Sequence, residues 1–134
     1  MSTAASDYAF SLNPDEAYGL PRNYYIDEDI FQREIEEIFY KTWQFIGTVH
    51  ELPEPGSFFS ATLVDQPVFA IRGKDGNIRA FHNACPHRGH EIVNGTGQKT
   101  ILTCPYHAWS FDTEGTLKAA GNSENVRGFN PADF

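Results

Sequence analysis

Between residues 26 and 42, apolar residues recur at three- and four-residue steps and are separated by charged residues. The apolar positions of this segment are Phe31, Ile35, Ile38 and Phe39. That spacing places them along one stripe of an α-helix and leaves the charged residues for water. Asp27 lies just before the stripe, where its carboxylate can accept hydrogen bonds from the free N–H groups of the first turn. We therefore predict a helix over residues 26–42, packed alongside the rest of the fold through its apolar stripe.

From residue 43 the pattern changes to short runs of aromatic and β-branched residues, interrupted by proline and glycine. These runs cover residues 43–49, 57–64, 68–72 and 78–82. Runs of this kind are typical of β-strands. Asp75-Gly76 lies between two of them, and Glu114-Gly115 lies between shorter runs at 110–111 and 116–117. A glycine in these positions favours a tight hairpin turn, so the pattern predicts antiparallel strands.

Two segments lack a periodic apolar pattern. Residues 1–25 are rich in Ser, Ala, Asn, Pro and Tyr, and we interpret them as an irregular arm. Residues 121–134 return to Asn, Gly and Pro, and we interpret them as a linker that leads onward. A chain of 134 residues can bury one modest core. The sequence thus divides into an arm (1–25), a helix (26–42), one mainly β domain (43–120) and a linker (121–134).

Charge and cysteine content exclude some classes of partner and favour one role for the cysteines. The formal net charge is −8 and no block of Lys or Arg is present, which argues against nucleic acid or an anionic membrane as a partner. No run approaches the ~20 apolar residues that span a bilayer, and the N-terminus lacks the basic and apolar regions of a signal peptide. We therefore expect a cytoplasmic protein. In that reducing compartment the cysteines favour a metal or redox role over a disulfide.

Two short segments each offer one thiolate and one imidazole. Cys85 is followed two positions later by His87, and Cys104 is followed three positions later by His107. Thiolate and imidazole together suit zinc or an iron–sulfur cluster, whereas calcium and magnesium prefer oxygen ligands. Structural zinc sites usually pair ligands of one type, as Cys with Cys and His with His. The alternation of Cys and His seen here instead matches a cluster with two irons, one held by two Cys and the other by two His.

The segments Cys85-Pro86-His87-Arg88-Gly89 and Cys104-Pro105-Tyr106-His107-Ala108-Trp109 resemble the Rieske motif of the ring-hydroxylating oxygenase α-subunits, which are Rieske non-haem iron oxygenases. The resemblance implies a small antiparallel β-sandwich-like domain that carries a [2Fe-2S] cluster and has an N-terminal α-helix. It also implies the ligands: Cys85 and Cys104 on one iron, and His87 and His107 on the other.

The respiratory branch of Rieske proteins is similar in its ligands but carries one more cysteine in each loop. This chain has no cysteine besides Cys85 and Cys104, and Tyr106 stands where the second loop would carry its extra one. The oxygenase branch is therefore favoured. Two alternatives remain, a freestanding Rieske ferredoxin and a zinc-binding structural module.

The resemblance also implies a function and its partners. A ferredoxin or flavin reductase would supply one electron, and the domain would pass it to a mononuclear iron in a catalytic oxygenase domain, where O2 is activated. The parent protein would be a homo-oligomeric oxidoreductase that hydroxylates an aromatic or other small organic substrate or oxidises an N-methyl compound. The chain ends at Phe134, where that domain would begin, and no two-His–carboxylate site for the mononuclear iron is visible. We therefore expect a fragment that contains no catalytic residue of its own.

The sequence also supports predictions for other histidines and for residues next to the motif. A lone histidine is more often structural than a ligand, so His50 and His82 are expected to be structural. His90 is expected either to flank the cluster as a hydrogen-bond donor or to lie on the surface. Trp109 is predicted to be apolar cover for the second loop. Gly89 is predicted to allow close approach of the backbone to the cluster.

Overall fold

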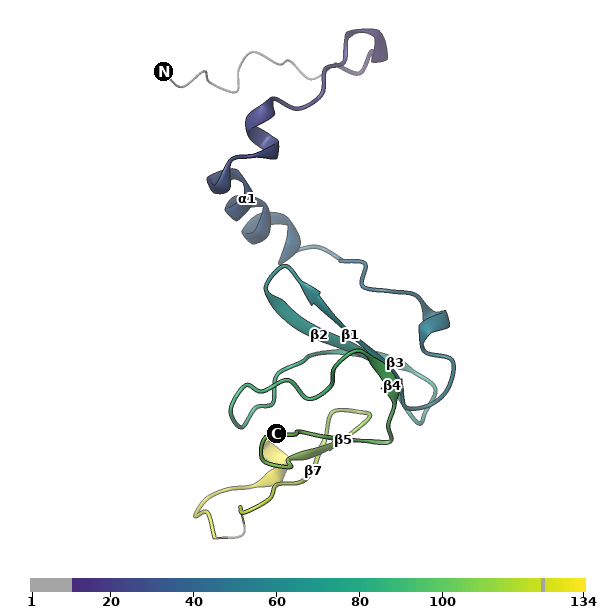
Figure 1. Cartoon of the computed structure of the whole chain (residues 1–134), viewed down its shortest axis with the longest axis vertical. Helices are drawn as coiled ribbons and strands as arrows, with labels where there is room; N and C mark the ends of the chain where they lie inside the picture. The colour runs from purple at the N-terminus through teal and green to yellow at the C-terminus, as the bar shows by residue number, and fades with distance from the viewer. Residues whose placement is uncertain (1–10, 124) are drawn as a thin grey trace. The chain divides into compact units, whose positions relative to one another are not determined.

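The computed structural model describes residues 11–123 and 125–134 of the chain. Contacts divide the chain into two compact units, Met1–Trp43 and Gln44–Phe134. The first ten residues of the expected arm, and Glu124 of the expected linker, lie outside the described residues. Figure 1 shows the helical segments of the first unit and the strands of the second.

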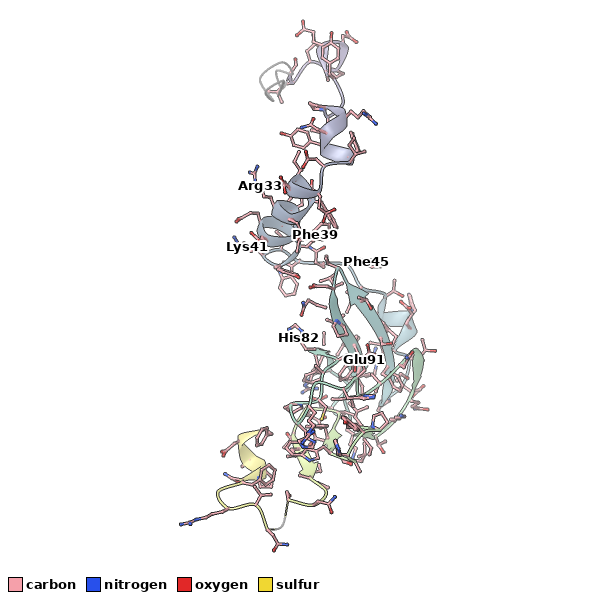
Figure 2. The ribbon with its side chains drawn as sticks, turned by 60° about the vertical axis from the view of Figure 1, so that its left-hand side comes forward. Arg33, Phe39, Lys41, Phe45, His82 and Glu91 are labelled. Atoms are coloured by element: carbon pink, nitrogen blue, oxygen red, sulfur yellow. The ribbon has the colours of Figure 1, made fainter. Side chains whose placement is uncertain are left out.

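The first unit is built from short helical segments. In chain order these are η1 (Pro14–Glu16), η2 (Arg22–Tyr25), α1 (Glu28–Glu34) and the wider π-helical turn η3 (Ile35–Phe39). As expected, Asp27 caps α1: its Oδ1 accepts hydrogen bonds from the N–H groups of Asp29 at 3.0 Å and Ile30 at 3.3 Å. Of the predicted apolar stripe, only Ile35 is buried. Figure 2 marks Arg33 and Lys41 on this segment, and the Lys41 ammonium pairs with the Glu37 carboxylate at 2.6 Å.

The second unit is mainly β, and its strands form two antiparallel sheets. The strands are β1 (Ser57–Leu63), β2 (Gln66–Arg72), β3 (Ile78–His82), β4 (Thr96–Gln98), β5 (Ile101–Thr103), β6 (Ser110–Asp112) and β7 (Leu117–Ala119). The first sheet has the order β3-β2-β1-β4 and the second the order β5-β6-β7. Two short 3-10 turns complete the unit, η4 (Val49–Glu51) and η5 (Pro131–Asp133). The predicted fold class, mainly antiparallel β with one short helix, is confirmed.

Side chains from both sheets share one core. Its buried residues are Phe58, Phe69, Ile71, Cys85, Ile92, Val93, Leu102, Cys104, Trp109, Phe111 and Leu117. Successive side chains of a strand point to opposite faces, so Phe59 and Ala70 leave this core and form a smaller cluster with Leu52 on the other face of the first sheet. Burial of each large apolar side chain contributes about 1.5–3 kcal/mol to folding. The core thus extends to the two cysteines at the ends of the strands.

Both predicted hairpin turns are present. The first joins β2 to β3, and Gly76 lies there at φ +80°, in the left-handed region that glycine adopts without strain. The second joins β6 to β7, where the Gly115 N–H donates to the Asp112 carbonyl at 3.2 Å. Alternation of apolar residues with a glycine turn was therefore sufficient to place these strands.

The predicted strand at 43–49 is wrong. Residues 43–48 have no regular structure, and the chain then enters η4. Thr48 and Glu51 form a capping box, in which the Thr48 N–H donates to the Glu51 carboxylate at 2.7 Å and thereby directs the chain into a helical turn. Trp43 and Phe45 are 102% and 82% exposed. Their aromatic character favours strands only where a neighbouring strand offers a surface to pack on.

Two short strands, β4 and β5, were not predicted. Pairing of β4 with β1 sets Gly97 opposite Phe58. A Cβ atom at position 97 would lie 2.9 Å from the Phe58 ring, so this polar segment can pair only because it has a glycine there. The need for glycine at position 97 comes from Phe58, almost forty positions away, so no apolar pattern in the local sequence predicts this strand.

Candidate metal centre

The first loop of the centre follows β3 and is closed by two backbone hydrogen bonds. The Cys85 N–H donates to the His90 carbonyl at 2.8 Å, and the Gly89 N–H donates to the Cys85 carbonyl at 2.7 Å. Gly89 lies at φ +69°. A Cβ added to it would meet no protein atom within 4 Å. The left-handed backbone by itself favours glycine here, and the close approach of the backbone to a cluster remains a prediction.

The second loop, between β5 and β6, repeats this arrangement. The Cys104 N–H donates to the Trp109 carbonyl at 2.8 Å, and the Ala108 N–H donates to the Cys104 carbonyl at 3.0 Å. Ala108 takes the place of Gly89 and has φ +58°. Two segments about twenty residues apart thus present a cysteine at the same point of the same turn. The loops form matching halves of one site.

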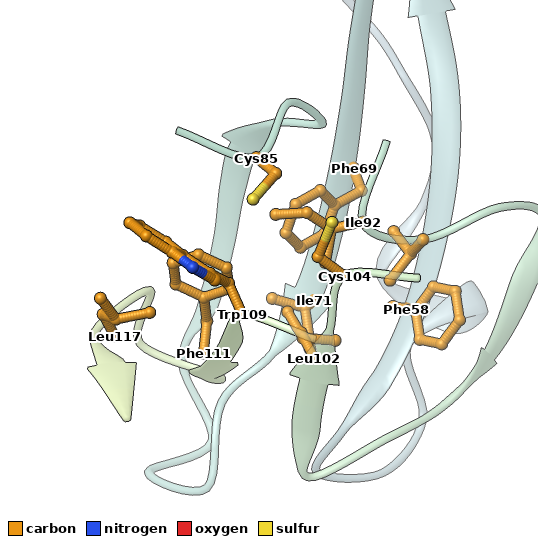
Figure 3. Packing of buried hydrophobic residues seen from close by; sticks show 11 residues of the cluster. Phe58, Phe69, Ile71, Cys85, Ile92, Leu102, Cys104, Trp109, Phe111 and Leu117 are labelled. Carbon is orange, nitrogen blue, oxygen red and sulfur yellow. The ribbon is translucent and has the colours of Figure 1, made fainter. Parts of the chain in front are cut away.

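The two cysteines bring their sulfur atoms to the edge of the core. Cys85 and Cys104 are each 2% exposed and are not joined by a disulfide, and Figure 3 shows them beside Trp109 and Ile92. Burial raises the pKa of the Cys85 thiol, although the backbone N–H of His87 donates a hydrogen bond to the sulfur and opposes the shift. A buried thiolate without a counter-charge is costly, and a cation is what would stabilise it.

The two imidazoles of the motif lie side by side. The ring centroids of His87 and His107 are 4.7 Å apart. His107 Nδ1 is buried and has no hydrogen-bond partner among the described residues. Burial lowers the pKa of His107, and the charges of His87 and Arg88 act in the same direction. Both effects favour the neutral His107 ring, which is the protonation state that binds a metal.

Aromatic rings cover both imidazoles. The Trp109 indole stacks on His87 with centroids 4.9 Å apart and an angle of 7° between the planes. The Tyr106 ring lies 3.8 Å from that of His107. Trp109 is 6% exposed, so its predicted role as apolar cover is confirmed.

The other histidines are not part of this arrangement. His50 in η4 and His82 in β3 are both exposed, and Figure 2 marks His82 on its strand. Neither belongs to the motif, and their expected structural role remains a prediction. His90 lies on the surface, where its Nδ1 is 2.7 Å from the Glu91 carbonyl oxygen and its ring is 5.7 Å from Tyr106. Arg88 is exposed and forms no ion pair with the described acidic residues.

Asn83 is a supporting residue that the sequence did not reveal. Its side chain is 1% exposed. Its Oδ1 accepts hydrogen bonds from the N–H groups of Ile92 at 2.9 Å and Val93 at 3.2 Å, while its Nδ2 donates to the Val93 carbonyl at 2.7 Å. These hydrogen bonds connect the residue just before the first loop with residues 92 and 93 just after it. A side-chain amide bridging two backbone segments has no signature in the local sequence.

The donor set fits a cluster with two irons. A structural zinc ion is held by four ligands around one point. A two-iron cluster needs only a pair of ligands at each iron. The buried cysteine pair and the adjacent imidazole pair provide this division, and the unpartnered His107 Nδ1 is a nitrogen available for a metal.

Comparison with known proteins assigns the family. Residues 42–130, which include all four residues of the motif, match the family model described as the Rieske [2Fe-2S] domain. The chain belongs to this family. Its relatives include oxygenase subunits of monooxygenases. One is the carnitine monooxygenase oxygenase subunit of Acinetobacter baumannii, 41% identical over 121 residues, which are 90% of this chain and 33% of that protein.

Solved structures similar to the Rieske domain come from two kinds of oxygenase. The quaternary ammonium Rieske monooxygenase CntA in complex with L-carnitine superposes with a TM-score of 0.84 at 40% identity, over 90% of this chain and 35% of that one. Naphthalene 1,2-dioxygenase superposes with a TM-score of 0.73 at 33% identity, over 80% of this chain and 25% of that one. This Rieske domain thus spans between a quarter and about a third of the length of such relatives. Among its described residues, no helix is both long and apolar enough to cross a membrane.

Proposed function

We propose that Cys85 and Cys104 hold one iron of a [2Fe-2S] cluster and that His87 and His107 hold the other. The proposal is supported by the matching backbone of the two loops and by the buried His107 Nδ1 that lacks a partner. When bound, such a cluster accepts and releases one electron at a time. The chain's own residues provide the thiolates, favour the neutral His107 ring and exclude water from the sulfur side.

The exposure of the ligands indicates where electrons would enter and leave. Both cysteines are buried, whereas His87 is exposed and His107 is partly exposed. We infer that a partner protein approaches the site from the side of the two histidines. We infer that a ferredoxin or flavin reductase delivers the electron there, in a cytoplasmic and homo-oligomeric oxygenase. The acceptor would be a mononuclear iron in a catalytic domain that activates O2.

For the complete oxygenase we propose a small quaternary ammonium substrate such as carnitine. The proposal is supported by the comparison, because the carnitine-binding relative is 40% identical and naphthalene dioxygenase 33%. Among the substrates that the resemblance implied, the N-methyl compound is therefore the first candidate and the aromatic compound the second. Oxygen consumption by the whole oxygenase with carnitine and, separately, with naphthalene would distinguish them.

Metal analysis of the purified chain tests the proposed cluster. We expect two iron and two acid-labile sulfide per chain, a red-brown colour and an electron paramagnetic resonance signal after reduction. Cys85→Ser should lose the iron, because a serine hydroxyl is a poor replacement for a thiolate. His82→Ala is the matched control, since His82 is an exposed histidine outside the site, and it should retain both iron and colour. A colourless protein with one zinc would rule the proposal out.

A further inference from the structure

Three aromatic side chains, Trp109, Phe129 and Phe134, form a cluster next to His87. Within this aromatic cluster the ring centroids of Trp109 lie 5.5 Å from Phe129 and 5.3 Å from Phe134, in both cases edge to face. The two phenylalanine rings stack at 5.5 Å. The opposite partner of Trp109 is the His87 imidazole, at 4.9 Å and nearly parallel. Contacts therefore run without a break from the C-terminal segment to a proposed cluster ligand.

The C-terminal segment is attached to the β unit at more than one point. The Leu117 N–H of β7 donates to the Phe134 carbonyl at 3.4 Å. Phe129 is half-buried and packs against the main core. Its own N–H donates to the Val126 carbonyl at 3.2 Å, which closes a turn just before the ring. Phe129 is thus held in place from both its backbone and its side chain.

Apart from the Trp109 indole, the aromatic neighbour of His87 among the described residues is the His107 ring at 4.7 Å. The His87 side chain is exposed, and its ring forms no hydrogen bond with any described residue. An indole stacked on one face limits the rotation of the imidazole and shields that face from water. The indole can do so only if it is itself fixed, and the edge-to-face contacts with Phe129 and Phe134 oppose its displacement.

We propose that Phe129 is a positioning residue, which acts through Trp109 to set the orientation of the His87 imidazole and to keep water from that side of the cluster. The inference rests on the proposed role of His87 as an iron ligand. Ligand orientation and solvent exposure both influence the reduction potential of a cluster. Water admitted near the cluster stabilises its more negative reduced form, so loss of the Phe129 ring should raise the potential.

The experiment compares Phe129→Ala with the wild-type chain, both containing the cluster. We expect a higher midpoint potential, altered couplings of the histidine nitrogens in pulsed electron paramagnetic resonance, and several-fold faster bleaching of the colour by a chelator. Phe129→Leu retains most of the apolar cover and should show smaller changes in the same direction. Phe129→Leu also serves as the test variant if Phe129→Ala does not retain its cluster. Val126→Ala is the control, because Val126 lies in the same segment and is 55% exposed.

The outcomes separate this inference from the proposed function. A wild-type chain without two irons would overturn the proposed cluster, and the inference with it. A wild-type chain that holds the cluster, together with Phe129 variants that melt earlier but keep the wild-type potential and nitrogen couplings, would overturn the inference alone. A purely structural Phe129 would give that second result.

Discussion

At the level of single residues, the sequence indicates which Cys and His residues come together better than it indicates which residues hold their loops in place. Cys85, His87, Cys104 and His107 stand at spacings with few chemical interpretations, and the structure brings the two cysteines together in the core and the two imidazoles within 4.7 Å of each other. Asn83 was missed because its partners lie nine and ten positions away. The matching backbone of the two loops could not be predicted from the sequence either, because one loop has glycine at position 89 and the other has alanine at the equivalent position 108.

Replacement of His107 by cysteine tests the imidazole as a ligand. A thiolate donates more negative charge to iron than a neutral imidazole, so His107→Cys should retain iron and lower the midpoint potential. The direction is toward the roughly −400 mV of clusters held only by cysteine. Voltammetry of the variant and of His82→Cys measures the effect, because His82 is exposed and outside the site. Equal potentials in the two variants would show that His107 is not a ligand.

At the level of elements, turn residues were more informative than strand residues. The Asp-Gly and Glu-Gly pairs placed both hairpins correctly, because a tight turn restricts the backbone locally. The strands β4 and β5 have only three residues each, too short for alternation to be recognised. The strand predicted at 43–49 was wrong for the opposite reason, because its composition favours a strand but its surroundings do not. The capping box of Thr48 and Glu51 starts a helical turn, and no strand among the described residues pairs with this run.

The β6–β7 hairpin depends on one carboxylate. Asp112 Oδ1 accepts hydrogen bonds from the N–H groups of Glu114 at 3.0 Å and Thr116 at 2.9 Å, and Oδ2 pairs with the Lys118 ammonium at 2.8 Å. We expect Asp112→Ala to lower the free energy of unfolding by about 1–3 kcal/mol, because two part-buried hydrogen bonds from backbone N–H groups lose their acceptor. Lys118→Ala should cost less, at most about 1 kcal/mol, since that side chain is exposed. Denaturant unfolding of the cluster-containing chains measures both.

The pH dependence of the Asp112→Ala effect follows from the pKa of the carboxyl. Burial alone would raise the pKa of Asp112, but the hydrogen bonds from Lys118, Thr116 and Glu114 outweigh burial and lower the pKa. A lowered pKa in the folded state means that the carboxylate stabilises the fold above the unfolded pKa, about 4, and that this contribution is lost as pH falls through the folded value. The difference between wild type and Asp112→Ala should therefore be constant near neutral pH and shrink below about pH 4. A difference that grows in acid would contradict this account.

At the level of the whole molecule, charge and hydrogen bonding together set the expected potential. Rieske potentials run from about −150 to +300 mV, and donors to the cluster sulfurs raise them by stabilising the more negative reduced form. The Ser110 hydroxyl, three positions after His107, is already committed: it lies 3.0 Å from the Thr103 hydroxyl and donates to the Ala108 carbonyl at 3.2 Å. The Tyr106 ring lies against His107, and its hydroxyl has no hydrogen-bond partner among the described residues. The Ser110 hydroxyl is therefore engaged within its own loop, and the Tyr106 hydroxyl remains available as a donor.

The net charge of the chain lowers the potential, because a formal charge of −8 disfavours the addition of an electron. We therefore expect a midpoint potential in the lowest third of the Rieske range, roughly −150 to 0 mV. Protein-film voltammetry at neutral pH and at two salt concentrations measures it, and added salt should raise the potential slightly by screening the acidic residues. Ser110→Ala is the matched control: if the Ser110 hydroxyl is bonded only within the loop, its removal should leave the potential close to that of the wild type. A wild-type midpoint above roughly +150 mV would mean that side-chain donors also reach the sulfurs, and it would favour a quinol-oxidising role over delivery of electrons to an oxygen-activating iron.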